Sequence, residues 1–181
     1  CPYCDEEYLH ILDRDGQDTV RTIELDHFFP KSSYPALALS FFNLVPSGQN
    51  CNGIKLKRTI GMSPFESDIE SYTKLYPDLP LVGVNMDTVP VEDCIIHFHP
   101  IGAMEQNVKV LRLEERYLNH RSEAHRYLTL KQNFNDEKLQ EGVRMGFFTS
   151  LEQAKEVLYG EVKNEGNHKL LQKLKHDILG F

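Results

Sequence analysis

The chain has 181 residues, of which 40% are apolar and 26% are charged, and its formal net charge is −7. These values are ordinary for a soluble globular protein built as one domain, or as one domain with a helical extension. The net charge argues against a protein that coats nucleic acid through bulk positive charge. The lack of an apolar run of about 18 residues argues against a membrane-spanning chain, and four cysteines are too few for a disulfide scaffold of this length. Without a signal-like leader, and with only four cysteines, we expect a cytoplasmic protein.

The first element is a pair of cysteines, Cys1 and Cys4. Their two-residue gap lets both thiolates reach one zinc ion, as in a zinc knuckle. A redox motif is the alternative, but the βαβ pattern that should follow it is absent. A polar turn at residues 13–18 and a strand over 19–26 come next, because the strand alternates apolar and polar positions and is rich in β-branched residues.

A second strand and a short helix follow this strand. The apolar segment 36–42 predicts a helical turn that packs on the core, and 43–47 predicts a strand that Pro46 ends. A short helix is expected over 52–58. Residues 21–60 carry five basic and two acidic side chains, which permits a local phosphate-binding face on an acidic protein.

The remainder of the chain predicts further strands and helices around this region, so that the fold class is α+β. The expected elements are a loop at 76–80, strands at 81–84, 94–98 and 108–111, a helix from 113 to about 134, a helix from the Ser150 capping box to Tyr159, and a final helix that Gly180 ends.

The polar residues of the first third suit phosphodiester hydrolysis, which needs an activated water, a positive centre and a stabilised leaving oxygen. His27 is the candidate general base, because imidazole titrates near neutral pH. Asp26 and Asn52 offer hard oxygen ligands for Mg²⁺ or Mn²⁺. Asn43 could hold the backbone or the imidazole of His27. Lys55, one helical turn after Asn52, could contact the phosphate.

Asp26-His27, Asn43-Leu44 and the run Cys51-Asn52-x-x-Lys55 together resemble the HNH endonuclease motif in its His-Asn-Asn variant. The resemblance covers about residues 1–58. It implies the ββα-metal fold, with His27 as general base, Asp26 and Asn52 as ligands of a single divalent metal, and Asn43 as the residue that orients the base.

A narrower resemblance involves residues 24–35 and 43–47, which are similar to bacterial HNH proteins of ATPase-linked phage-defence systems of the Septu kind. It implies an ATPase partner that gates cleavage. Our leading hypothesis is a metal-dependent nuclease that acts on DNA as an effector in a defence complex. On this interpretation residues 1–60 form the HNH nuclease core with its zinc-knuckle-like start. Residues 61–181 form a mixed strand and helix extension that packs on the core and could bind a partner.

One departure from the HNH pattern concerns the zinc. The family usually has a second cysteine pair, but Gly48 stands where its first cysteine belongs, which leaves Cys1, Cys4 and Cys51. Structural zinc sites are nearly always four-coordinate. Either another side chain supplies the fourth ligand, or the site is weak or empty and the three thiols are simply buried. The candidates for the fourth ligand are Cys94, His97 and His99.

Two alternatives to a DNA nuclease stay open. The chain could be a catalytically silent zinc-knuckle or HNH-like binding module, in which Asp26 and His27 form a strand-end pair, Asn43 shapes a turn, Asn52 caps a helix and Lys55 lies on a solvated face. It could also be an RNA-cleaving HNH nuclease, because the motif contacts phosphate and not sugar.

Overall fold

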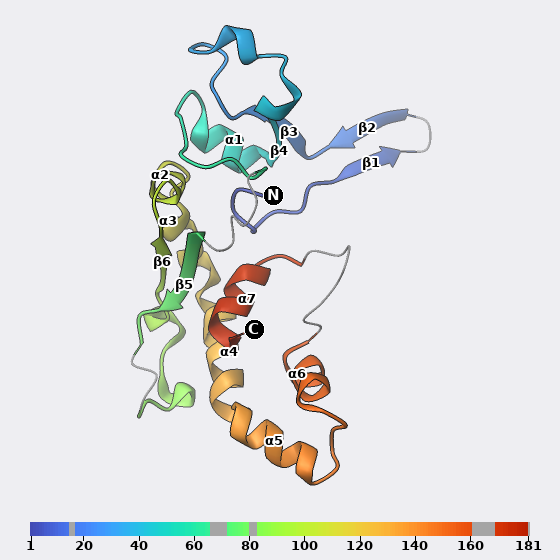
Figure 1. Ribbon diagram of the computed structural model, residues 1–181, viewed down its shortest axis with the longest axis vertical. Coiled ribbons are helices and arrows are strands. Elements are labelled where there is room, and N and C mark those ends of the chain that lie inside the picture. Colours follow the sequence, from blue (N-terminus) through green and yellow to red (C-terminus); the bar gives the residue numbers. More distant parts are fainter. Residues whose placement is uncertain (15–16, 66–71, 80–82, 161–168, 181) are drawn as a thin grey trace. The chain divides into compact units, whose positions relative to one another are not determined.

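A computed structural model describes residues 1–14, 17–65, 72–79, 83–160 and 169–180. Helices and short antiparallel strands together confirm the α+β class. The chain divides into two compact units, Cys1–Lys74 with Phe98–Arg116 and Leu75–His97 with Tyr117–Phe181 (Figure 1). Among these described residues, no helix is both long and apolar enough to cross a membrane. Of the predicted strand at 81–84, residues 81 and 82 lie outside the described residues, and 83 and 84 are not in a strand.

The first unit carries the predicted motif residues. Its elements are β1 (Ile11–Arg14), β2 (Gln17–Arg21), β3 (Ile23–His27), the 3-10 turns η1 (Pro35–Leu37) and η2 (Phe41–Asn43), β4 (Leu44–Gly48), α1 (Gln49–Lys55), α2 (Met104–Val110) and most of α3 (Leu113–Tyr117). β1 pairs with β2 and β3 with β4, both antiparallel. The chain crosses between units within β5 (Thr73–Pro77) and β6 (Ile96–Pro100), which form a third two-stranded sheet in the described part of the chain.

The sequence predicted that Pro46 ends the second strand, and this prediction is wrong. The hydrogen-bond pattern of the β3–β4 pair explains why. The Phe28 N–H donates to the carbonyl of Asn43 at 2.9 Å, which makes these two residues a hydrogen-bonded pair. Bonded and non-bonded pairs alternate along an antiparallel ladder, so Pro46 opposite Leu25 falls in a non-bonded pair. Proline has no N–H to donate, and at this position none is needed. β4 therefore continues to Gly48.

The segment between β3 and β4 does not pack on the core as predicted. Its helical part consists of the short turns η1 and η2, and neither buries an apolar side chain. Leu39 is 94% exposed, and Phe41 and Phe42 are 77% and 79% exposed. Backbone carbonyls of this segment, and not its apolar side chains, contact the rest of the unit. The apolar composition therefore led to a wrong prediction of burial.

Helix α1 begins and ends three residues earlier than predicted, spanning 49–55 instead of 52–58. It starts as soon as β4 ends, with Gly48 in extended conformation at its N-cap, and it stops where Leu56 takes a positive φ of 50°. Asn52 is consequently an interior helix residue and not an N-cap. Gly48, the last residue of β4, is therefore followed directly by the first residue of α1.

The predicted strand at 108–111 is wrong, because these residues belong to helix α2 and its C-terminal cap. Met104, Asn107 and Val108 are its buried positions, which is helical spacing. The Asn107 side chain accepts from the N–H groups of Gly61 and Met62 and donates to the Met62 carbonyl. A short apolar run fits a strand and a helix equally well. In the helix, Asn107 lies on the same buried face as Met104 and Val108, where its amide makes these hydrogen bonds.

The second unit is mostly helical. Its elements are the 3-10 turns η4 (Met86–Thr88), η5 (Val91–Asp93) and η6 (Leu118–His120) and the helices α4 (Arg121–Asn133), α5 (Asp136–Arg144), α6 (Leu151–Tyr159) and α7 (Gln172–Leu179). The long helix predicted from 113 is divided by η6, and α5 was not predicted. The Ser150 capping position and the Gly180 stop are confirmed. Buried residues of this unit include Ala124, Leu128, Leu139, Ala154, Leu174 and Ile178.

Candidate functional site

Asp26 lies near the end of β3 and is almost fully buried, with 3% of its surface exposed. The Tyr3 hydroxyl donates to Oδ2 at 2.8 Å, and Lys55 Nζ lies 3.0 Å from Oδ2 and 3.1 Å from Oδ1. Burial, and then the negative charge of Asp26, raise the pKa of Tyr3, so the phenol stays protonated and donates. Asp26 is therefore the centre of a buried, hydrogen-bonded ion pair between β3 and α1.

Lys55 is fully buried, which is rare for lysine unless it is paired. Besides Asp26 it binds the backbone carbonyl of His27, at 2.7 Å. Its place in the last turn of α1 thus ties the helix to the end of β3. In this conformation the ammonium group contacts protein groups, and its predicted contact with a phosphate stays a prediction.

The next residue, His27, is half-buried. Its Nε2 lies 3.0 Å from the carbonyl oxygen of Ala38, in the segment between β3 and β4. A carbonyl oxygen only accepts, so Nε2 carries the hydrogen, and in a neutral imidazole the other nitrogen, Nδ1, is then an acceptor. The fold thereby selects one tautomer and leaves Nδ1 with the basic lone pair.

Asn43 holds the backbone on both sides of this imidazole. Its Oδ1 accepts from the Phe29 N–H at 2.7 Å, and its Nδ2 donates to the carbonyls of Phe29 and Leu37 at 3.1 and 3.0 Å. Phe29 follows His27 closely in the chain, and Leu37 precedes the carbonyl that receives the His27 bond. Asn43 is 3% exposed, so these bonds are made away from water. The sequence predicted a contact with the backbone or the imidazole of His27, and the Asn43 side chain instead binds the backbone of Phe29 and Leu37.

Asn52, in the middle of α1, lies against Glu24 rather than Asp26. Its Nδ2 donates to Glu24 Oε2 at 2.5 Å, which leaves its own amide oxygen as an acceptor. Glu24 and Asp26 are two apart on β3 and share one face of the strand. Carboxylate and amide oxygens of this kind suit Mg²⁺ or Mn²⁺. A cation at Asp26 would compete with Lys55, because the ammonium already balances that charge.

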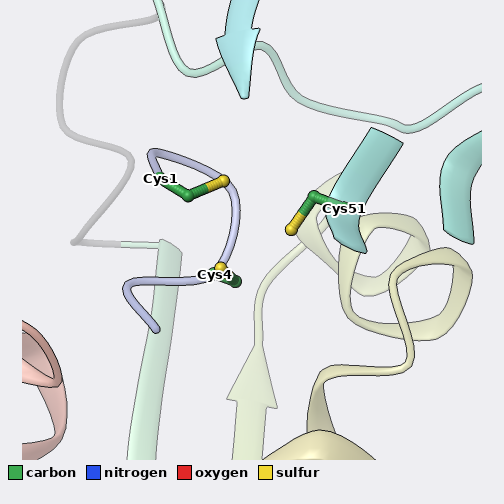
Figure 2. Close-up of side chains that lie close together, drawn as sticks. All are labelled: Cys1, Cys4 and Cys51. Atoms are coloured by element: carbon green, nitrogen blue, oxygen red, sulfur yellow. The ribbon is translucent and has the colours of Figure 1, made fainter. Parts of the chain in front are cut away.

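The three predicted cysteines come together. Cys1 and Cys4 lie on the N-terminal loop and Cys51 reaches toward them from α1 (Figure 2), with their sulfurs all within 4.8 Å of one another. Backbone N–H groups support two of the sulfurs: Gly48 donates to Cys1 Sγ at 3.3 Å, and Glu6 donates to Cys4 Sγ at 3.4 Å. Cys51 accepts from a side chain, as described next.

Arg116 brings a positive charge to this cluster. Its guanidinium donates to Cys51 Sγ at 3.2 Å and lies 2.7 Å from a Glu6 carboxylate oxygen. The hydrogen bond from Cys51, opposed in part by burial, lowers the pKa of Cys4, with the Glu6 N–H and Arg116 adding to the effect. Cys51 retains its proton in the pair, and its own pKa is raised. Close sulfurs with thiolate character fit a thiophilic metal such as zinc.

The candidate fourth ligands are not part of this cluster. Among the residues that the structure describes, the group able to hold a metal contains the three cysteines alone. Cys94 is buried in the second unit, where burial raises the pKa of its thiol. His97 lies 3.5 Å from a carboxylate oxygen of Asp78, and His99 is exposed on β6.

Three site residues were missed from the sequence. Glu24 carried a signal, because a residue two before Asp26 on a strand shares its face. Tyr3 lies between the two paired cysteines, but nothing local connects it to Asp26, 23 residues away. Arg116 is 65 residues from Cys51 and has no sequence signal at all. Its place depends on how the chain returns to the first unit after β6.

Comparison with known proteins gives one partial similarity. The chain is 38% identical over 55 residues to the Septu protein PtuB of Bacillus thuringiensis, and this stretch is 30% of the present chain and 18% of that protein. The match thus spans less than a fifth of the relative's length. No protein-family model matches the chain. No solved structure matches it either. The similarity links the chain to Septu proteins over less than a third of its own length.

Proposed function

We propose that this chain is a metal-dependent HNH endonuclease that hydrolyses phosphodiester bonds of DNA as an effector of anti-phage defence. The observation that carries the proposal is the hydrogen bond from His27 Nε2 to the Ala38 carbonyl, which in a neutral imidazole leaves Nδ1 with the lone pair that a general base needs. The partial similarity to a Septu protein supports the defence role.

In this proposal each polar residue has one task. His27 Nδ1 accepts a proton from the water that attacks phosphorus, and Asn43 keeps the imidazole in position through the backbone of Phe29 and Leu37. Asp26 and Asn52 would hold a Mg²⁺ or Mn²⁺ ion, which when bound stabilises the negative charge that develops on the phosphate. Lys55 can contact a phosphate only if its ammonium group leaves Asp26. The cation bound at Asp26 would then balance the carboxylate charge that Lys55 balances now.

The defence setting adds a partner. An ATPase that gates cleavage accounts for a nuclease that must stay inactive until infection, and residues 61–181 are the region proposed to bind it. The assay below therefore uses the chain alone and the chain together with an ATPase encoded beside it.

The test is a plasmid-nicking assay with Mg²⁺ or Mn²⁺. Replacing His27 by alanine removes the base, so we expect nicking to fall by about 10²–10⁴-fold. His99→Ala is the matched control, because it removes an exposed histidine outside the cluster of motif residues. Both variants need unchanged circular dichroism. Nicking by His27→Ala at the wild-type rate would overturn the assignment of the base.

A silent binding module is the second candidate, and one observation favours it: Asp26 is already fully engaged by Lys55 and Tyr3. The same assay separates the two. Wild-type protein that is inactive on plasmid, on tRNA and on single-stranded RNA, with and without the ATPase, supports the silent module. Activity on RNA alone, lost in His27→Ala, supports an RNA-cleaving nuclease instead.

A further inference from the structure

The segment between β3 and β4 presents two aromatic rings to solvent. Phe41 and Phe42, the first two residues of η2, are 77% and 79% exposed. Their ring centroids are 5.8 Å apart and their planes are inclined by 83°, so the rings meet edge to face. Apolar side chains exposed singly are common on protein surfaces, whereas adjoining ones more often mark a binding site. These two rings are therefore candidates for contact with a ligand.

The backbone that carries the rings is already ordered. The Ser40 N–H donates to the Leu37 carbonyl at 3.0 Å, and the Ser40 carbonyl accepts from the Asn43 N–H at 3.0 Å. The buried Asn43 side chain holds the Leu37 carbonyl as well. Little backbone freedom is left to lose when a ligand binds, which favours binding.

The same segment contacts the proposed general base. The Ala38 carbonyl, three residues before Phe41, lies 3.0 Å from His27 Nε2. A nucleic acid strand whose phosphate is attacked at His27 therefore passes beside this segment. A partner protein seated here would compete with that strand for the approach to His27.

The charge of the segment favours nucleic acid over protein as its ligand. Residues 28–42 contain one basic residue, Lys31, and no acidic residue, although the chain as a whole has a net charge of −7. Phosphates are attracted by such a surface and repelled by acidic side chains. Lys31, Ser32 and Ser33 are exposed beside the aromatic residues. Lysine and serine are depleted in protein–protein interfaces.

The geometry of the rings favours unpaired bases. Inside a duplex each base is covered by its stacked neighbours, so a protein ring can stack only on a base that is unpaired or splayed out. Two rings at 83° to each other cannot both stack on parallel bases, which suits a strand whose bases are unstacked at this point. We propose that Phe41 and Phe42 form a stacking platform for unpaired bases of the DNA strand that is cleaved at His27. This inference rests on the proposed nuclease function and specifies a substrate with a single-stranded stretch at the site.

Tryptophan fluorescence tests the contact directly, because the chain contains no tryptophan. In the full chain, Phe41→Trp keeps a ring at this position and makes it the one indole fluorophore. A single-stranded DNA of about 15 nucleotides is added, with Ca²⁺ in place of Mg²⁺ or Mn²⁺ so that the strand stays intact. We expect the fluorescence to be quenched, and the same strand annealed to its complement to quench it much less. Equal quenching by the two forms, or none by the single strand, would overturn the proposal.

Binding affinity gives a second measurement. Phe41→Leu combined with Phe42→Leu keeps the segment apolar but removes both ring faces, and fluorescence anisotropy should show binding of the same single strand weakened by about tenfold or more. Both positions are exposed, so the variant should fold, and circular dichroism checks this. Leu39→Ala is the matched control, because it removes a side chain that is 94% exposed in the same segment without removing a ring. It should bind the strand as the wild-type chain does.

The outcomes separate the stacking platform from other uses of the rings. Equal weakening by Leu39→Ala would overturn the proposal, by showing a general apolar contact. Wild-type DNA binding by the double leucine variant, together with loss of its complex with the ATPase, would overturn it by identifying a protein contact. Neither measurement involves cleavage, so failure of the platform is distinguishable from failure of the proposed nuclease. A chain that nicks plasmid while the leucine variant binds single strands normally retains the nuclease and loses the platform.

Discussion

At the scale of single residues, the motif side chain of Asp26 has a partner outside the motif, whereas Lys55 has its partners within it. Asp26 is held by Tyr3 from the N-terminal loop, and Lys55 is buried between Asp26 and the carbonyl of His27. A buried charge of this kind is stable only while its partner is present. Asp26 and Lys55, which are candidate residues for metal and phosphate binding, are therefore also residues on which folding depends. Variants at these two positions need a stability measurement beside any activity measurement.

Lys55→Met tests this dependence. Methionine fills similar volume but leaves the carboxylate of Asp26 buried without its counter-charge, so we expect the free energy of unfolding to fall by about 3–5 kcal/mol. Urea denaturation followed by circular dichroism measures it. Lys57→Met, at an exposed position two residues on, should change stability by less than about 0.5 kcal/mol. Equal urea midpoints for the two variants would contradict a structural role for Lys55.

At the scale of elements, the capping signals at Ser150 and Gly180 were accurate, while the expected burial of a short apolar segment was not. Ser150 caps α6 because its Oγ accepts from the Gln153 N–H at 3.1 Å. Segment 36–42, by contrast, is apolar yet exposed. A cap involves atoms three residues apart, so the sequence contains both partners. Burial depends on what the rest of the chain places over a segment.

The cap on α6 gives a prediction at this scale. Ser150→Ala removes the acceptor for the Gln153 N–H and should lower the free energy of unfolding by about 1 kcal/mol. Ser150→Asp restores an acceptor and adds a negative charge near the helix N-terminus, so it should retain most of the wild-type stability. Thermal unfolding of the three proteins provides the measurement. Loss of stability in both variants would show that the hydroxyl acts through something other than the cap.

At the scale of the whole molecule, the chain forms two compact units, and each is assembled from two separate stretches of sequence. The first unit combines residues 1–74 with 98–116, which is how Arg116 comes to contact Cys51. The sequence predicted a different division, into a nuclease core at 1–60 and an extension at 61–181. That division is based on proposed functions and not on which residues pack together, and it stays a prediction.

Metal removal should affect the two units unequally. The cysteine cluster joins the N-terminal loop to α1, and metal binding to such a cluster contributes to folding. After treatment with a strong chelator we expect hydrogen exchange to rise at α1 and in the loop of Cys1 and Cys4, with little change in α4 and α7. Exchange followed by mass spectrometry measures both units in one sample. An equal rise throughout, or none, would show that the cluster does not stabilise the first unit locally.

By itself the amino-acid sequence determined the fold class, the grouping of three cysteines, and the helix signals at Ser150 and Gly180. It also placed Asp26 and His27 at the end of a strand, although the single strand predicted over 19–26 is divided between β2 and β3. These features depend on period, spacing and side-chain chemistry over a few residues, which are local. The boundaries of α1 and the helical state of 108–110 were misjudged because short segments satisfy strand and helix patterns equally well.

Only the tertiary structure decided which partner each polar group has. Asp26 pairs with Lys55, Asn52 with Glu24, and Glu7 fills the space beside Gly48. Each of these contacts joins residues 28 to 41 positions apart. The reason is physical: a buried charge or amide takes the partner that packing brings within hydrogen-bond distance, and packing is a property of the whole chain.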